Sequence, residues 1–141
     1  MSAHDTPSWC ARTLVTLCLS IFPLLVPLLE ANASHLFNTH WPPHARLHEA
    51  WQLMANAAVA TCAIAWAWTP GRFRQACLLG MLLSGSFVVA WSLRDAYGGS
   101  MAGTTTGGAK VLGLDLAVAV MAAAFCVFTQ GLIATRTRVA S

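Results

Sequence analysis

The apolar and polar positions of this chain form four long apolar blocks separated by short polar stretches. Each block approaches the roughly 20 residues that a helix needs to cross a hydrocarbon core of about 30 Å. Short connections indicate neighbouring helices within a single domain over residues 1–141. The pattern predicts an all-α fold, an integral membrane four-helix bundle. The predicted helices span residues 12–30, 44–68, 74–94 and 110–134, and the predicted outer loops span 31–43 and 95–109.

The composition supports a membrane protein. Hydrophobic residues make up 57% of the chain and charged residues 9%, whereas a typical soluble domain has about 25% charged residues. Four crossings leave no room for an aqueous catalytic domain, so any chemistry lies in or beside the bundle. The net charge of +3 is small and comes from scattered residues, so a nucleic-acid surface has no support. The cysteines form no CxxC pair and are expected to pack as small apolar residues: Cys10, Cys18, Cys62, Cys77 and Cys126.

Lysines and arginines near the helix ends predict the orientation, because cytoplasmic segments carry the excess. One side has Arg12, Arg72, Arg74, Arg136 and Arg138, and the other has Arg46, Arg94 and Lys110. This bias places both termini in the cytoplasm and both longer loops on the outer face. A chain rich in Ala, Trp and Arg indicates a bacterial inner membrane. Tryptophans near the predicted ends are typical of an aromatic belt: Trp41, Trp51, Trp66, Trp68 and Trp91.

The first and third blocks carry features of their own. Pro23 and Pro27 predict a kink in the first helix, which membrane helices tolerate. The same block could instead be a signal peptide that is cleaved near residues 31–33, but we expect a retained helix. In the third block, Gly80 and Ser84 offer a small face for close helix packing.

A histidine-rich stretch precedes and opens the second helix. Residues four apart stack on one helix face, so His44, His48, Gln52 and Asn56 predict a polar stripe. Lipid penalises such side chains, so we expect the stripe to face the bundle interior. There it would meet Asp115, which the pattern places about one turn into the fourth helix. The expected cavity has a rim of Glu30, Arg46, Glu49, Arg94 and Asp95.

Two chemistries fit this predicted cavity. Histidine ionises near neutral pH, and beside a carboxylate it can transfer protons on a lipophilic small molecule without a cofactor, as an isomerase, hydratase or cyclase does. The predicted catalytic residues are His44, His48, Asp115 and Glu49, and the predicted ligand-binding residues are His40, Trp41, Arg46, Gln52, Asn56, Glu30, Arg94 and Asp95. Alternatively, His44 and His48 bind one metal ion, completed by His40, Glu49 or Asp115.

Structural interpretations compete with both chemistries. The histidines would then be amphipathic residues at headgroup level, Asp115 would pair with a cation between helices, and Glu49 would pair with Arg46. A further alternative is a non-catalytic accessory or assembly subunit whose polar stripe packs against a membrane protein partner or a second copy.

The run Phe37-Asn-Thr-His-Trp-Pro-Pro-His-Ala-Arg-Leu-His48 resembles a signature of small, largely uncharacterised four-helix membrane proteins of bacteria and fungi. Their common form is Asn, a Trp-Pro pair, then His-Ala-Arg or His-Ala-Lys and a second His at the head of the second helix. The matching positions are Asn38, Trp41, Pro42, His44, Arg46 and His48. The resemblance covers about a dozen residues. It implies the topology and singles out the motif, and it implies no reaction.

Overall fold

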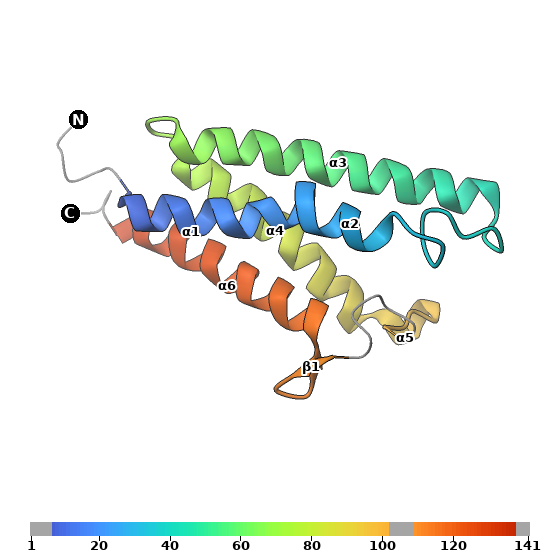
Figure 1. Cartoon of the computed structure of the whole chain (residues 1–141). Helices are drawn as coiled ribbons and strands as arrows, with labels where there is room; N and C mark the ends of the chain where they lie inside the picture. Colours follow the sequence, from blue (N-terminus) through green and yellow to red (C-terminus); the bar gives the residue numbers. More distant parts are fainter. Residues whose placement is uncertain (1–6, 102–108, 138–141) are drawn as a thin grey trace.

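The computed structural model describes residues 7–101 and 109–137, with the side chains of 136 and 137 excluded. It confirms an all-α bundle with four helices long and apolar enough to span a membrane. The first helix begins and the last helix ends at the same end of the bundle, which we call the terminal end (Figure 1). Residues 31–42, α5 (Arg94–Tyr97) and a short β-hairpin lie at the other, which we call the loop end. The chain is an integral membrane protein.

The first span consists of three consecutive helical segments. α1 (Trp9–Ser20) begins at Ser8, whose side chain accepts a hydrogen bond from the Ala11 amide. A π-helical turn, η2 (Ile21–Leu25), follows, and α2 (Val26–Glu30) completes the span. The Val26 N–H donates to the Ile21 carbonyl, five residues back. Pro23 and Pro27 cannot donate to the regular ladder, so the irregular turn falls where the sequence predicts a kink.

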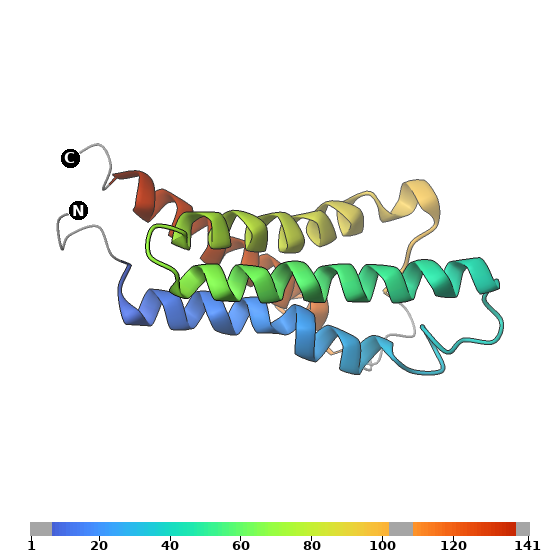
Figure 2. The same ribbon diagram turned by 90° about the horizontal axis from the view of Figure 1, so that it is seen from above.

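The second and third spans form the expected hairpin. α3 (Pro43–Trp68) starts at Pro43, one residue before the predicted start, because proline suits the first helical turn. α4 (Phe73–Ser92) follows a tight turn in which Gly71 has φ +75°. Figure 2 shows the first span, α3 and α4 running alongside one another.

The start of the fourth helix differs from the prediction. α6 spans Leu116–Thr137, whereas residues 110–115 form a hairpin of β1 (Lys110–Val111) and β2 (Leu114–Asp115). Leu112 and Gly113 at its tip have φ of 51° and 81°, the left-handed pair that a tight hairpin turn requires. The apolar pattern predicted a helix through this segment. Leu112 is instead 98% exposed and lies in the hairpin turn. The predicted loop residues 102–108 and Arg138 lie outside the described residues.

Small residues let the spans approach closely. A Cβ on Gly80 would lie 2.5 Å from Cε1 of Phe128, and one on Gly131 would lie 2.6 Å from Sγ of Cys77, so α4 and α6 meet at both glycines. The inner face of α3 consists of small buried residues, Ala60, Ala63 and Ala67. Ser84 is also buried, and its hydroxyl donates to the Gly80 carbonyl. The predicted small face of α4 is therefore confirmed.

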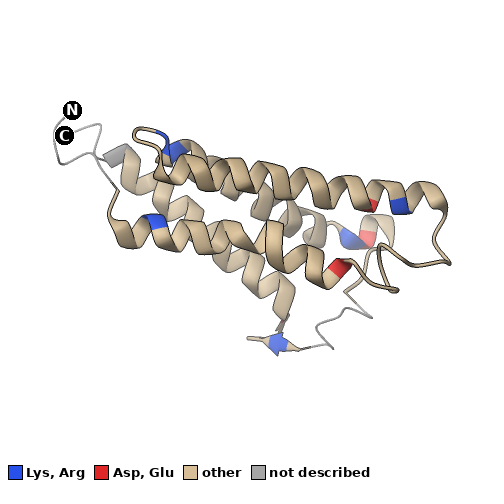
Figure 3. Ribbon diagram, turned by 45° about the horizontal axis from the view of Figure 1, so that its top comes forward, with Lys and Arg blue, Asp and Glu red and all other residues tan. Residues whose placement is uncertain are grey.

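Arginine and tryptophan side chains tie the helices together at the terminal end. The Arg12 Nη1 donates to the Ala67 carbonyl at 3.0 Å, and the Trp68 Nε1 donates to the Thr16 hydroxyl at 2.9 Å. The Arg72 guanidinium lies 5.4 Å from the Trp66 ring centroid. Figure 3 shows cations at both ends and the described carboxylates gathered at the loop end.

We predict that Gly80→Val lowers the free energy of unfolding by about 1–3 kcal/mol, because the fully buried Phe128 ring has little room to move away from a new side chain. The measurement is thermal unfolding in mild detergent, followed by tryptophan fluorescence. Ala90→Val, on an exposed position of the same helix, is the matched control. Equal midpoints for the two variants would contradict this account of the α4–α6 contact.

Candidate functional site

The predicted polar stripe on α3 does not face the bundle interior. His44, His48 and Gln52 are exposed, and only Asn56 is half-buried. Four residues advance an α-helix by about 400°, so each step turns the stripe by about 40° beyond a full circle. Over the three steps from His44 to Asn56 the stripe rotates by about 120°. Because the buried face of α3 is fixed by Leu53 and the alanines below it, the stripe begins on the outside.

The length of α3 explains how exposed imidazoles are tolerated. Its 26 residues extend about 39 Å, which exceeds the roughly 30 Å of a hydrocarbon core. Its tryptophan-rich end, Trp66 to Trp68, leads directly into the arginine-bearing turn. Counting about 20 residues back from Trp68 therefore places His44 and His48 at headgroup level rather than among lipid tails.

His44 and His48 do come together. Their Nε2 atoms lie 2.9 Å apart, and the rings meet edge to face with centroids 4.4 Å apart. The Trp51 ring lies 5.9 Å from that of His48. Among residues 7–101 and 109–137, no group of three or more His, Cys, Asp or Glu side chains is arranged to hold a metal ion. The pair thus offers two protein ligands.

Asp115 does not join these histidines. It lies in β2 opposite Lys110, before α6 begins, so the predicted position one turn inside an apolar helix is wrong. Within the described part of the chain, no hydrogen bond or ion pair connects Asp115 to His44 or His48. The hairpin turn, which the apolar pattern did not indicate, moves this carboxylate out of the helix.

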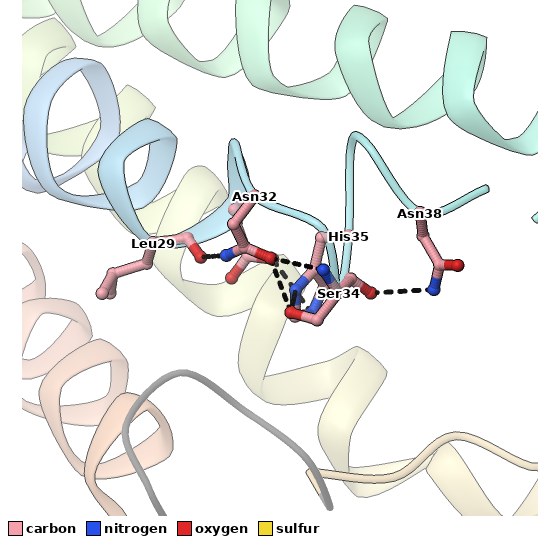
Figure 4. Close-up of polar contacts among 6 residues, drawn as sticks. Leu29, Asn32, Ser34, His35 and Asn38 are labelled. Atoms are coloured by element: carbon pink, nitrogen blue, oxygen red, sulfur yellow. Dashed lines mark hydrogen bonds and ion pairs between the residues drawn. The ribbon is translucent and has the colours of Figure 1, made fainter. Parts of the chain in front are cut away.

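The loop after α2 holds a compact polar network, shown in Figure 4. The Asn32 amide nitrogen donates to the Leu29 carbonyl, and its oxygen accepts from the Ser34 amide at 2.7 Å and the Ser34 hydroxyl at 2.6 Å. Asn38 donates to the Ser34 carbonyl and accepts from the His40 amide. These contacts fix the loop without a regular helix or strand.

His35 links this network to the end of the first span. Its Nε2 lies 3.2 Å from Oε2 of Glu30, and its Nδ1 lies 2.9 Å from the Ser34 hydroxyl oxygen. The side chains of His35 and Glu30 are 25% and 29% exposed, so solvent reaches the pair only in part. The Trp41 ring stands edge-on to the imidazole, with centroids 6.0 Å apart. Glu49 on α3 is near enough for its charge to act on Glu30.

Which groups donate and which accept in this network depends on whether one or both ring nitrogens of His35 carry a proton. With both ring nitrogens protonated, Nε2–H donates to Glu30, Nδ1–H donates to Ser34, and the Ser34 hydroxyl donates to Asn32. With Nδ1 unprotonated, Nδ1 and the Asn32 oxygen are both acceptors. The Ser34 hydroxyl has one proton and can donate it to only one of them. The line from Glu30 through His35 to Ser34 can therefore hold or release one proton.

The remaining predicted rim residues are spread over the loop end. Arg46 is half-buried, and its Nε is buried without a hydrogen-bond partner among the described residues. The Nε of Arg94 lies 3.7 Å from Oδ1 of Asp95, and its Cζ lies 4.7 Å from the centroid of the Trp91 ring. No ion pair joins Arg46 to Glu49 in the described ranges, so the expected i, i+3 pairing is not formed. His40 is exposed.

Sequence reasoning missed Ser34 and His35 as site residues. A signal for them exists, because Asn32-x-Ser34 and Asn38-x-His40 both fit the Asx turn, in which an Asn oxygen accepts from the amide two residues on. Two such turns around His35 indicate an ordered loop rather than a flexible one.

Comparison of the chain with protein-family models, with curated proteins and with solved structures finds no match. The resemblance of residues 37–48 to a membrane-protein signature stays a prediction.

We predict that Asn32→Ala loosens the loop, because the Ser34 amide and hydroxyl lose their acceptor and the Leu29 carbonyl loses a donor, at a local cost of about 1–3 kcal/mol. The measurement is amide hydrogen exchange over residues 32–40, which should become faster. Thr39→Ala, an exposed position in the same loop, is the control and should leave exchange unchanged. Unaltered exchange in Asn32→Ala would refute the proposed role of the Asn32 side chain.

Proposed function

We propose that the protein carries out acid–base chemistry on a lipophilic small molecule at its loop end. The observation that carries the proposal is the line of contacts from the Glu30 carboxylate through the His35 imidazole to the exposed Ser34 hydroxyl. This keeps the proton-transfer function that the sequence indicates and changes its residues, since the predicted partner Asp115 lies elsewhere.

The chemistry of each residue follows from its contacts. The His35 imidazole is the proton carrier, and Glu30 stabilises its charged form through Nε2. Ser34, at Nδ1, is the outermost group of the line and would pass the proton to or from a bound molecule. General acid–base transfer of this kind contributes about 10²–10⁴-fold to a rate.

The surroundings favour a substrate that arrives from the lipid. Glu30 ends a membrane span, and Leu28, two residues before it, is 79% exposed. Phe37 in the same loop is also exposed. A molecule with an apolar body and a polar end could rest its body on these side chains while its polar end meets Ser34. The excess of arginine at the terminal end favours a loop end that faces outside, in a bacterial inner membrane.

Hydrogen–deuterium exchange into lipids tests this proposal without knowledge of the substrate. The protein is reconstituted with a bacterial lipid extract in D₂O, and the lipids are analysed by mass spectrometry for deuterium bound to carbon. We expect protein-dependent incorporation into one lipid class, reduced at least about tenfold by His35→Asn and by Glu30→Gln. His44→Asn is the matched control and should keep the exchange.

Absence of protein-dependent deuterium incorporation would contradict proton-transfer catalysis. Incorporation that survives His35→Asn but not His44→Asn would assign the chemistry to the α3 pair instead.

A second function, metal binding, is favoured by the convergence of His44 and His48. For metal–nitrogen bonds of about 2.0–2.1 Å, two nitrogens at a right angle lie about 2.9 Å apart, and at a tetrahedral angle about 3.3 Å apart. The observed Nε2 separation of 2.9 Å is a hydrogen-bond distance between the two rings, and it also brings both nitrogens within reach of one metal ion such as Cu²⁺. Water or a second protein would supply the other ligands.

Copper titration tests the metal function. We expect one Cu²⁺ per chain with nitrogen ligands in the electron paramagnetic resonance spectrum, and at least about tenfold weaker binding in His44→Ala and in His48→Ala. His40→Ala, an exposed histidine outside the pair, is the control. Equal weakening by all three substitutions, or no stoichiometric copper, would exclude the His44–His48 site.

A further inference from the structure

A cavity of about 330 Å³ opens between α4 and α6 at the terminal end, away from the candidate site at the loop end. Its walls are mainly apolar, from Leu78, Met81, Leu132 and Ile133. Arg74, in the first turn of α4, also lines it. Because Arg74 precedes Met81 by seven helical residues, the cavity runs about 10 Å from the arginine into the span. Its shape and lining suit a hydrocarbon chain.

The charges around this cavity favour an anion. The described carboxylates, Glu30, Glu49, Asp95 and Asp115, all belong to elements of the loop end (Figure 3). Among residues 7–101 and 109–137, the terminal end therefore has cations and no acidic side chain.

The arginines of the terminal end differ in what they contact. Arg12 donates to the carbonyls of Pro7 and Ala67, and Arg72 stacks on Trp66. Arg74 is exposed and, within the described part of the chain, makes no hydrogen bond or ion pair to another side chain. Its guanidinium is thus free to bind an external group, and its fork of donors matches a phosphate.

We infer that this cavity is a binding site for an anionic phospholipid, with one acyl chain between α4 and α6 and the phosphate on Arg74. The apolar wall accounts for the chain, and the unpaired guanidinium at the surface end of the wall accounts for the headgroup. Basic pockets between membrane helices recognise such headgroups. A zwitterionic headgroup would gain less, because its own positive group offsets the attraction between its phosphate and Arg74. The inference is independent of the chemistry proposed for the loop end.

Lipid competition in nanodiscs tests the site. The full chain is reconstituted in equal amounts of dioleoyl phosphatidylglycerol and dioleoyl phosphatidylcholine, and the lipids retained on release are counted by native mass spectrometry. We expect phosphatidylglycerol to be retained at least about fivefold over phosphatidylcholine, since one well-placed cation contributes about 1 kcal/mol. Arg74→Gln should remove this preference.

Arg72→Gln is the matched control. It removes the same charge two residues before Arg74, from a side chain that already stacks on Trp66. It should keep most of the preference. Leu132→Phe should lower retention of both lipids by narrowing the cavity while Arg74 stays in place. Soluble glycerol phosphate should not compete, since it lacks the chain that the apolar wall binds.

Equal losses in Arg74→Gln and Arg72→Gln would overturn the inference, because they would indicate general attraction to the surface. Equal retention of the two lipids by the unsubstituted protein would overturn it as well. Competition by glycerol phosphate would assign the site to a free phosphate ester instead of a lipid. Tryptophan fluorescence of each variant verifies that the bundle is folded before the lipids are counted.

Discussion

Close contact between helix backbones is the constraint on which this bundle depends. In lipid the apolar side chains of a helix gain little by leaving their surroundings, so association depends on packing at short range. Gly80 and Gly131 provide that range between α4 and α6, where the Phe128 ring and the Cys77 sulfur occupy the space that a side chain would need. The alanine face of α3 extends the same principle, and many large apolar side chains, such as Leu24, Leu28 and Trp51, face outward.

The four spans and the start of α3 are predictable from sequence, because block length and Pro42-Pro43 act locally. The place of Asp115 is not, since the left-handed pair at Leu112 and Gly113 overrides an apolar pattern that continues through it. The outward direction of His44 depends on which face of α3 the neighbouring helices bury, and the pattern of α3 alone leaves that face undefined. Contacts of His35 depend on a loop whose order comes from Asn32 and Asn38, which the pattern marks only as polar.

Polar chemistry divides between the two ends of the bundle. The loop end gathers carboxylates, imidazoles and amides, and short contacts join some of them, such as the one between Glu30 and His35. Among the described arginines of the terminal end, Arg12 contacts backbone carbonyls and Arg72 stacks on an indole ring. The first arrangement suits transfer of a proton and the second suits attraction of an anion. The apolar stretch between them keeps the two chemistries about a membrane thickness apart.

The π-helical turn in the first span determines which way Glu30 points. A π turn accommodates one residue more than a regular turn, and one residue corresponds to about 100° of rotation about the helix axis. Everything beyond Leu25 is therefore rotated relative to α1, so the packing of α1 on its neighbours does not dictate the azimuth of the carboxylate. Glu30 therefore points in a direction that it would not have in a continuous regular helix. The two prolines that prevent a regular ladder keep this rotation in place.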